Sequence, residues 1–146
     1  MSELITFKLL DFNSAAQLET IELRDKILRK PLGLQFTGEQ LAAEKDMFHL
    51  AGYCNDKLVC CMVLQKTENG ALKMRQVAVD ENQQKKGYGQ LMTAWMENWA
   101  KENGFKRIYC HARDIAVPFY EKMYYKIYGE RFVEVSIPHF KMEKYI

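Results

Sequence analysis

The sequence lacks the features that mark a membrane protein, a secreted protein or a general nucleic-acid-binding protein. Its 146 residues contain no apolar run near the roughly 20 residues that a membrane-spanning helix needs. The opening segment, MSELITFKLLDFNS, lacks the basic stretch, the apolar stretch and the small-residue cleavage site of a secretory signal. The net charge at pH 7 is only +2, which favours neither nucleic acid nor an anionic membrane as a partner. We therefore expect a cytoplasmic protein with no nucleic-acid or membrane partner.

Cysteine is scarce, and its spacing does not indicate metal binding. The four cysteines, Cys54, Cys60, Cys61 and Cys110, show neither zinc-ligand nor redox-pair spacing. Cys54, Cys60 and Cys61 lie in apolar, strand-like segments, where a reduced thiol packs as a small hydrophobic side chain. We expect buried thiols in a reducing cytoplasm and no metal site.

The composition and length indicate one domain of ordinary size. Hydrophobic residues make up 48% of the chain and charged residues 27%, so it can bury a core and remain dissolved. We find no internal repeat, low-complexity segment or linker, and we predict a single domain over residues 1–146. Residues 5–12, 48–54, 58–65, 71–80 and 105–112 read as strands, and a last strand lies within 133–146, interrupted or bounded at Pro138.

Helical spacing of apolar residues predicts helices between these strands. Helices are expected at 14–30, with Leu18, Ile21, Leu23, Ile27 and Leu28 broadly on one side, at 37–46 and at 116–123. The clearest helix begins behind residue 87 and is stopped by Gly104. Its repeating apolar positions are Leu91, Met92, Trp95, Met96 and Trp99. The order predicts an α+β (mixed α/β) fold with antiparallel and parallel neighbours.

The segment QQKKGYGQLM, residues 83–92, has the composition of an anion-binding loop. Glycines at 87 and 89 remove side chains that would block a phosphate, and they allow successive backbone NH groups to point inward. The first NH groups of the following helix lack intrahelical partners, and the helix dipole adds partial positive charge there. Lys85 and Lys86 add mobile charge. The segment alone is equally compatible with a solvated, flexible turn.

The segments around this loop resemble the GNAT acetyltransferase superfamily. Gln84-Lys85-Lys86-Gly87-Tyr88-Gly89 has the Gln/Arg-x-x-Gly-x-Gly/Ala form of that family's coenzyme A loop, and RQVAVD before it is similar to the family's fourth strand. HARDIAVPFYEKMYYKIYGE resembles the strand-helix segment that follows. FVEVSIPHFKMEK is similar to small stand-alone bacterial members that carry Ile-Pro-His near the C-terminus.

The resemblance implies a GNAT fold and acetyl-CoA as co-substrate. The fold would have a central, mixed but mostly antiparallel sheet, with splayed fourth and fifth strands and about four flanking helices. Backbone groups of Val77, Ala78 and Val79 would pair with the pantetheine arm, and the NH groups of Lys85 to Gln90 would hold the pyrophosphate. The full set of cofactor-binding candidates is Val77, Ala78, Val79, Gln84, Lys85, Lys86, Gly87, Tyr88, Gly89, Gln90, His111, Ala116 and Phe119. His111 replaces the family's usual Asn, and it either bonds a pantetheine amide or lines the acceptor pocket.

The resemblance makes Tyr120 the general acid that protonates the leaving thiolate. We expect Phe119 to enter the core and Tyr120 to face the groove, because only Tyr120 has a hydroxyl that needs a partner. The base is less evident: KMRQVAV offers no carboxylate where many relatives carry Glu, and Arg75 occupies one such place. His139 is the candidate, since the ordinary pKa of histidine suits proton transfer. His49, in an expected strand, faces either the acceptor groove or solvent.

These residues predict an acetyl-CoA-dependent N-acetyltransferase that moves the acetyl group directly to a primary amine. The acceptor is a small molecule, a peptide or a protein, and a homodimer is possible from the resemblance. Arg24, Lys26, Arg29 and Lys30 on the first helix either attract an acidic substrate or form its wet face. The absence of a carboxylate base favours an alternative, a non-catalytic acyl-CoA-binding sensor or partner module.

Overall fold

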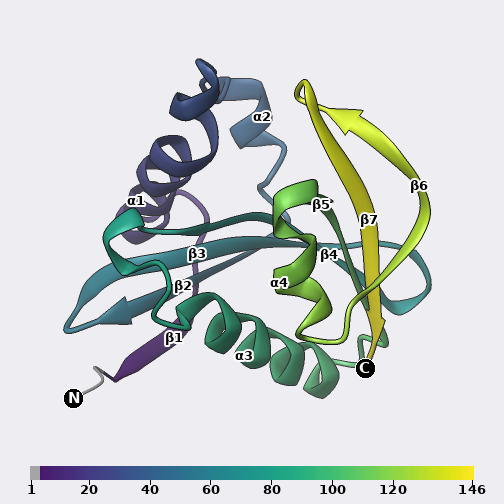
Figure 1. The fold of residues 1–146 in the computed structure, drawn as a ribbon. Helices are drawn as coiled ribbons and strands as arrows, with labels where there is room; N and C mark the ends of the chain where they lie inside the picture. The colour runs from purple at the N-terminus through teal and green to yellow at the C-terminus, as the bar shows by residue number, and fades with distance from the viewer. Residues whose placement is uncertain (1–3) are drawn as a thin grey trace.

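A computed structural model describes residues 4–146, and its centre is one seven-stranded sheet (Figure 1). The strands are β1 (Ile5–Leu10), β2 (Phe48–Cys54), β3 (Lys57–Lys66), β4 (Ala71–Val79), β5 (Arg107–Arg113), β6 (Lys126–Glu134) and β7 (Ile137–Tyr145). The helices are α1 (Ala15–Arg24), α2 (Gly38–Ala42), α3 (Tyr88–Glu102) and α4 (Val117–Glu121). Short turns of other helix types are η1 (Asp25–Arg29), η2 (Lys30–Leu32), η3 (Glu68–Gly70), η4 (Glu81–Gln83) and η5 (Asp114–Ala116).

The strand order is β1-β2-β3-β4-β5-β7-β6, and only β4 and β5 run parallel. The other neighbouring pairs are antiparallel, as short connections allow. Asn55 and Asp56 close the β2–β3 hairpin with positive φ angles of 50° and 63°, which suits a tight hairpin turn. The mixed, mostly antiparallel sheet that the sequence predicts is therefore confirmed.

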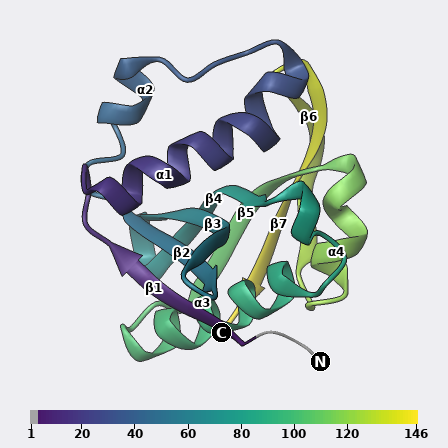
Figure 2. The ribbon, with the colours of Figure 1, turned by 90° about the vertical axis from the view of Figure 1, so that its left-hand side faces the viewer.

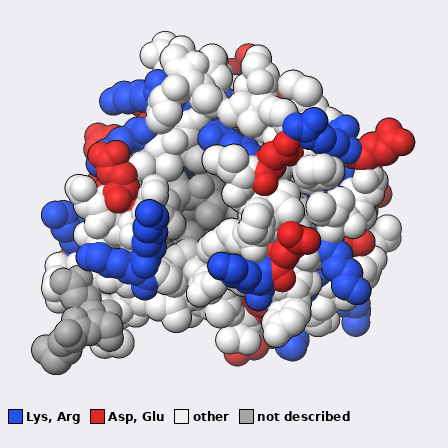
Figure 3. All heavy atoms as spheres, viewed as in Figure 1, with Lys and Arg blue, Asp and Glu red and all other residues white. Residues whose placement is uncertain are grey.

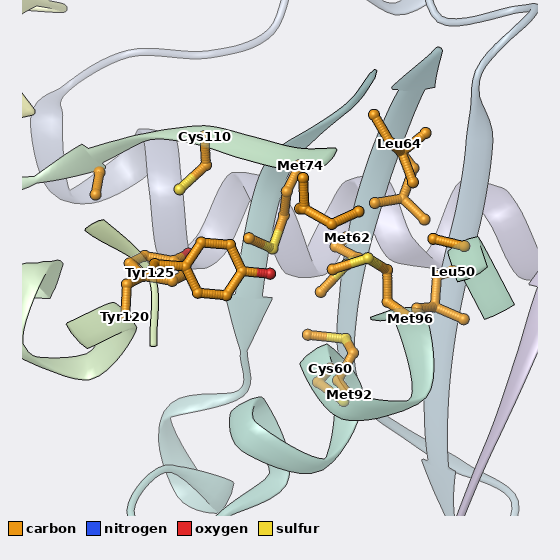
Figure 4. Packing of buried hydrophobic residues seen from close by; sticks show 14 of the residues in the cluster. Leu50, Cys60, Met62, Leu64, Met74, Met92, Met96, Cys110, Tyr120 and Tyr125 are labelled. Atoms are coloured by element: carbon orange, nitrogen blue, oxygen red, sulfur yellow. The ribbon is translucent and has the colours of Figure 1, made fainter. Parts of the chain in front are cut away.

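Helices cover both faces of the sheet (Figure 2). One face packs against α3 and α4 through a core rich in methionine, with Met62 and Met74 from the strands against Met92 and Met96 of α3 (Figure 4). The other face carries α1 and η1 over a smaller cluster built on Leu23, Cys61 and Ala78. In the described part of the chain, no helix combines the length and the apolar character needed to cross a bilayer.

The buried face of α1 is more polar than its sequence pattern predicts. Gln17, Thr20, Leu23 and Arg24 are buried, whereas Leu18 is 48% exposed. Arg24 is fully buried because both of its terminal nitrogens donate to the Glu44 carboxylate, at 2.8 and 2.6 Å. A paired guanidinium can occupy a core position that pattern reasoning reserves for apolar side chains. In α3, Leu91 is likewise 49% exposed and not part of the core face.

The C-terminal segment forms two strands, whereas the sequence pattern predicts one within 133–146. Val133 and Glu134 end β6, Val135 and Ser136 form a tight turn with positive φ angles, and β7 follows. Pro138 is the second residue of β7, where a missing backbone donor is tolerated near the strand start. The sequence pattern does not predict β6 as a separate strand, because β6 lies at the sheet edge, is mostly exposed and therefore has little apolar alternation.

Candidate active site

The site is a fork between β4 and β5. Their parallel pairing begins at Ala71 opposite Arg107 and ends at Met74 opposite Cys110. Beyond this point β4 continues beside β3 to Val79, while β5 continues beside β7 to Arg113. The two strands are thus splayed, as the sequence resemblance implies, and their backbone edges face each other without pairing.

A β-bulge starts the fork on the β4 side. Arg75 is opposite Val63 and Ala78 is opposite Cys61, so Gln76 and Val77 together face one residue of β3. Gln76 has a φ of 54°, an unusual angle for a residue other than glycine. A bulge of this kind increases local twist and bends its strand, which turns the end of β4 away from β5. Val77 and Val79 then pack towards the large core, and Ala78 towards α1.

The loop after β4 aims the start of α3 at the open end of the fork. Gly87 immediately precedes α3 with a φ of 83°, and no side chain caps the helix. Lys85, at a φ of 68°, also has the left-handed conformation that turns successive NH groups to one side. The side chains of Gln84, Lys85, Lys86 and Gln90 are exposed. The uncapped NH groups and the loop lysines together form a place for an anion.

The two glycines of the loop differ in their surroundings. A Cβ on Gly87 would meet nothing within 4 Å, so the space in front of the helix end is open. A Cβ on Gly89 would lie 3.1 Å from the Phe119 ring and 3.7 Å from Val79. Gly89 therefore also lets α3 approach α4 closely. Tyr88, also expected to bind cofactor, is buried in the large core.

Tyr120 and Phe119 exchange the places expected for them. Tyr120 is buried beside Cys110 at one end of the large core (Figure 4), and its ring centroid lies 5.7 Å from that of Tyr125. Phe119 is only partly buried and packs on the core surface with Ala116. We expected Phe119 in the core and Tyr120 at the groove. The structure instead buries Tyr120 and leaves Phe119 partly exposed at the core surface. Its hydroxyl makes no hydrogen bond to residues 4–146, and burial raises the pKa of this phenol.

Two histidines meet at one carboxylate on the α1 face of the sheet. His111 Nδ1 lies 3.1 Å from Glu134 Oε1, and His139 Nε2 lies 3.8 Å from Glu134 Oε2. Both rings also contact Phe132 of β6, with centroid distances of 5.0 and 5.7 Å. Glu134 was not a sequence candidate, because it ends a strand that the pattern did not separate from β7.

The ring nitrogens of His139 have distinct roles. Nδ1 lies 2.7 Å from the Ile137 carbonyl, which only accepts, so Nδ1 carries the hydrogen. Neutral His139 then has its lone pair on Nε2, on the side of Glu134, where it can take a proton. His49 does not face a groove or solvent: it is buried, and its Nε2 lies 3.0 Å from the Glu44 carbonyl.

No thiol of the described chain is prepared for covalent chemistry. All four cysteines are free and buried, as the sequence predicts. Cys110 is the nearest to the fork, and burial raises the pKa of its thiol to about 12 although Lys73 lowers it slightly. Within residues 4–146, no group of three or more His, Cys, Asp or Glu side chains could hold a metal ion.

Comparison with known proteins extends over most of the chain. The sequence model of the acetyltransferase (GNAT) domain family matches residues 22–146. The Bacillus subtilis (strain 168) protein YjcF, named an uncharacterized N-acetyltransferase, is 25% identical over 84% of this chain and 87% of its own. Protein YyaT of the same organism is 31% identical over 74 residues, which are 51% of this chain and 50% of that protein.

Solved structures share the fold at low sequence identity. A Lactobacillus plantarum protein described as an N-acetyltransferase has a TM-score of 0.86 at 18% identity and covers 97% of both chains. A GNAT family acetyltransferase from Elizabethkingia anophelis with acetyl-CoA bound has a TM-score of 0.75 at 15% identity, covering 97% of this chain and 98% of that one. The forked sheet and the family match lead to one conclusion: the chain belongs to the GNAT acetyltransferase family, a family of acyltransferase enzymes.

Proposed function

We propose that this GNAT acetyltransferase binds acetyl-CoA along the fork and transfers the acetyl group directly to a primary amine. The observation that carries the proposal is the fork itself, which ends at an uncapped helix terminus behind a glycine with a φ of 83°. The diphosphate would lie on the NH groups of residues 85–90, and the pantetheine arm would pair with the free edge of β4 at residues 77–79. The Elizabethkingia anophelis structure named above contains acetyl-CoA, which supports this choice of co-substrate.

In direct transfer, the amine nitrogen attacks the thioester carbonyl, a C–N bond forms, and the C–S bond then breaks. Binding both reactants in one fork makes the reaction effectively unimolecular. The amine proton would go to Nε2 of His139, directly or through water, and the coenzyme A thiolate would take a hydrogen bond or proton from Tyr120. The raised pKa of Tyr120 keeps its hydroxyl protonated and favours hydrogen bonding over complete transfer. The high thiol pKa of Cys110 supports direct transfer over an acyl-enzyme.

The test compares two glycines that flank α3. Gly87 and Gly104 have φ angles of 83° and 84°, and a Cβ on either would meet nothing within 4 Å. Replacing either by alanine should therefore cost similar stability, roughly 1–2 kcal/mol. We expect Gly87→Ala to weaken acetyl-CoA binding at least tenfold in calorimetry, and Gly104→Ala to leave it unchanged. Equal affinities in the two folded variants would contradict the proposed diphosphate site.

Activity is tested by thiol release from acetyl-CoA in the presence of separate classes of amine: small amines, amino sugars, peptide N-termini and lysine peptides. Amine-dependent release with a matching acetylated product supports the proposal. Acetyl-CoA binding without release from any class would instead support the non-catalytic module. A cytoplasmic location and a homodimer remain parts of the proposal, and light scattering would measure the latter.

A further inference from the structure

Three arginines converge on the α1 face of the fork from three different elements. Arg75 is the first residue of β4 beyond its last pair with β5, and Arg113 ends β5 on the same face as His111. Arg29 ends η1, which packs against β4. Figure 3 shows that the surface is hollowed near the middle of this view, with both basic and acidic residues around the hollow. The hydrogen bond from Arg113 to the Leu28 carbonyl joins the end of β5 to η1, which places Arg113 next to Arg29.

Each arginine is oriented by a neutral partner. Arg113 donates to the Leu28 carbonyl at 3.4 Å, and Arg75 donates to the side-chain oxygen of Gln65 at 3.2 Å. Arg29 lies over the Phe36 ring, with 4.5 Å between its Cζ atom and the ring centroid. These contacts hold the guanidinium groups in place but leave their positive charges uncompensated.

No carboxylate among residues 4–146 forms an ion pair with Arg29, Arg75 or Arg113. Arg24 differs from these three, because the Glu44 carboxylate accepts two hydrogen bonds from it and neutralises its charge. The pKa of Arg29 is lowered first by burial and then by repulsion from Arg24 and Arg113, with Glu134 opposing the shift. The nearby Glu134 carboxylate is already engaged by His111.

Half-buried like charges without counter-charges destabilise a protein, and a bound anion would relieve that cost. Guanidinium groups recognise carboxylates and phosphates through paired hydrogen bonds. We propose that the acetyl acceptor is an amine that also carries an anionic group, a carboxylate or a phosphate ester, and that Arg29, Arg75 and Arg113 bind this group. The amine of such a molecule would reach into the fork towards the histidine pair. The proposal rests on the proposed acetyltransferase function and names the class of its acceptor.

The first experiment uses the unaltered enzyme and pairs of amines that differ in one charge. β-Alanine is compared with β-alaninamide, and O-phosphoethanolamine with ethanolamine, at rates corrected for the fraction of free amine. We expect kcat/KM to be at least about tenfold higher for the anionic member of one pair, the scale of a single charged hydrogen bond. The pair that shows the effect distinguishes carboxylate from phosphate. Equal or higher rates with both neutral members overturn the inference while leaving acetyltransfer intact.

The second experiment assigns the preference to the arginines. Arg75→Gln and Arg113→Gln should each reduce the ratio of anionic to neutral kcat/KM about 10- to 100-fold, mainly through KM, because a charged hydrogen-bond pair is lost. The matched control is Lys101→Gln, which removes one positive charge from an exposed position at the far end of α3. If Lys101→Gln lowers the ratio of anionic to neutral kcat/KM as much as the arginine variants do, the preference comes from general electrostatic attraction, and the proposed arginine site is wrong.

The third experiment is independent of turnover. Melting temperatures of the protein without acetyl-CoA are measured with each of the four amines at equal ionic strength. We expect the anionic members to raise the melting temperature more than their neutral partners, and Arg75→Gln to abolish the difference. No difference in the unaltered protein overturns the inference, whether or not any amine releases thiol. Failure of the acetyltransferase proposal is recognised separately, because calorimetry would then detect no binding of acetyl-CoA to the unaltered protein.

Discussion

At the residue scale, Tyr120 combines burial with a polar group that has no protein partner. Its ring belongs to the core, and its hydroxyl forms no hydrogen bond with the described residues. In the described residues, the buried side-chain atoms without a partner are Arg24 Nε, Asp25 Oδ1 and Asp114 Oδ1, so the Tyr120 hydroxyl is not sealed inside the core. A hydroxyl without a protein partner can bond a ligand, and the proposed ligand is the coenzyme A sulfur.

Replacing Tyr120 by phenylalanine tests this role, because the ring remains and only the hydroxyl is lost. We expect kcat to fall by about 100-fold or more, the usual scale for acid–base catalysis. Acetyl-CoA affinity should stay nearly constant, and stability should not fall, since no protein hydrogen bond is removed. Turnover within about threefold of the unaltered enzyme would make Tyr120 a packing residue. Steady-state thiol release and calorimetry measure both quantities.

Tyr124 is a second residue whose local conformation is informative. It follows α4 at the turn that leads into β6. Tyr124 has a φ of 71°, the left-handed angle that glycine adopts easily, and its side chain is 80% exposed.

Tyr124→Gly should therefore stabilise the protein. Relief of the left-handed strain is worth about 1–2 kcal/mol, and the greater freedom of glycine in the unfolded chain removes about 0.5–1 kcal/mol of it. The expected net gain is about 0.5–1 kcal/mol in the free energy of unfolding. Urea denaturation measures it, with Tyr124→Ile as the comparison that should lose stability. A loss in the glycine variant would show that the Tyr124 ring, near Lys144, matters more than the backbone.

At the element scale, β5, β6 and β7 bring the two histidines together. Arg113 is paired with His139 across β5 and β7, and His139 is paired with Phe132 across β7 and β6. The pKa of His111 is lowered chiefly by burial, and Lys73 and Lys141 lower it further, while Glu134 opposes them. A lowered folded-state pKa means that His111 stabilises the fold when neutral.

The sign of this shift predicts a pH dependence. Stability from His111 is fully present above the ordinary histidine pKa, near 6.5, and is lost as the pH falls through the lower folded-state value. We expect His111→Asn to flatten the decrease in melting temperature below about pH 6.5. Separately, His139→Asn should lower kcat with little change in acetyl-CoA affinity, because it removes the proposed acceptor of the amine proton. An unchanged kcat in this variant would assign that role to His111 or water.

At the scale of the whole molecule, the buried Arg24–Glu44 pair connects α1 to the segment that follows α2. The Arg24 guanidinium also lies over Phe36, the same ring that Arg29 contacts, so this pair supports the position of the proposed anion site. Arg24 Nε is buried without a hydrogen-bond partner, which leaves this polar cluster incompletely satisfied. We expect the pair to hold this polar cluster in place more than to add net stability.

Breaking this pair from one side should be costly, and replacing both partners should not be. Arg24→Met or Glu44→Leu alone is expected to lower the free energy of unfolding by about 3–5 kcal/mol, because a buried charge loses its partner. The double variant should recover most of the loss in urea denaturation. If the losses of the two single variants simply add in the double variant, the two side chains are not energetically coupled, which would contradict this prediction.

The sequence by itself determined the parts of this protein that depend on local patterns. The loop from Gln84 to Gly89, the long helix behind it and the strands β2 and β3 follow from glycine positions and apolar runs, and the structure confirms these elements. Together with the segment around Phe119 and Tyr120, these patterns also gave the family. Such features need only neighbouring residues, so their physical causes are visible in the chain.

Only the tertiary structure decided which distant side chains meet. Glu134 reaches His111 across 23 positions and Arg24 reaches Glu44 across 20, and neither contact has a local signal. The exposed edge strand β6 also carries too little apolar alternation to be recognised. Arg29, Arg75 and Arg113 lie far apart in the sequence, and only the fold brings them to one face of the fork. Electrostatic energy depends on distance in space, and the sequence gives only distance along the chain.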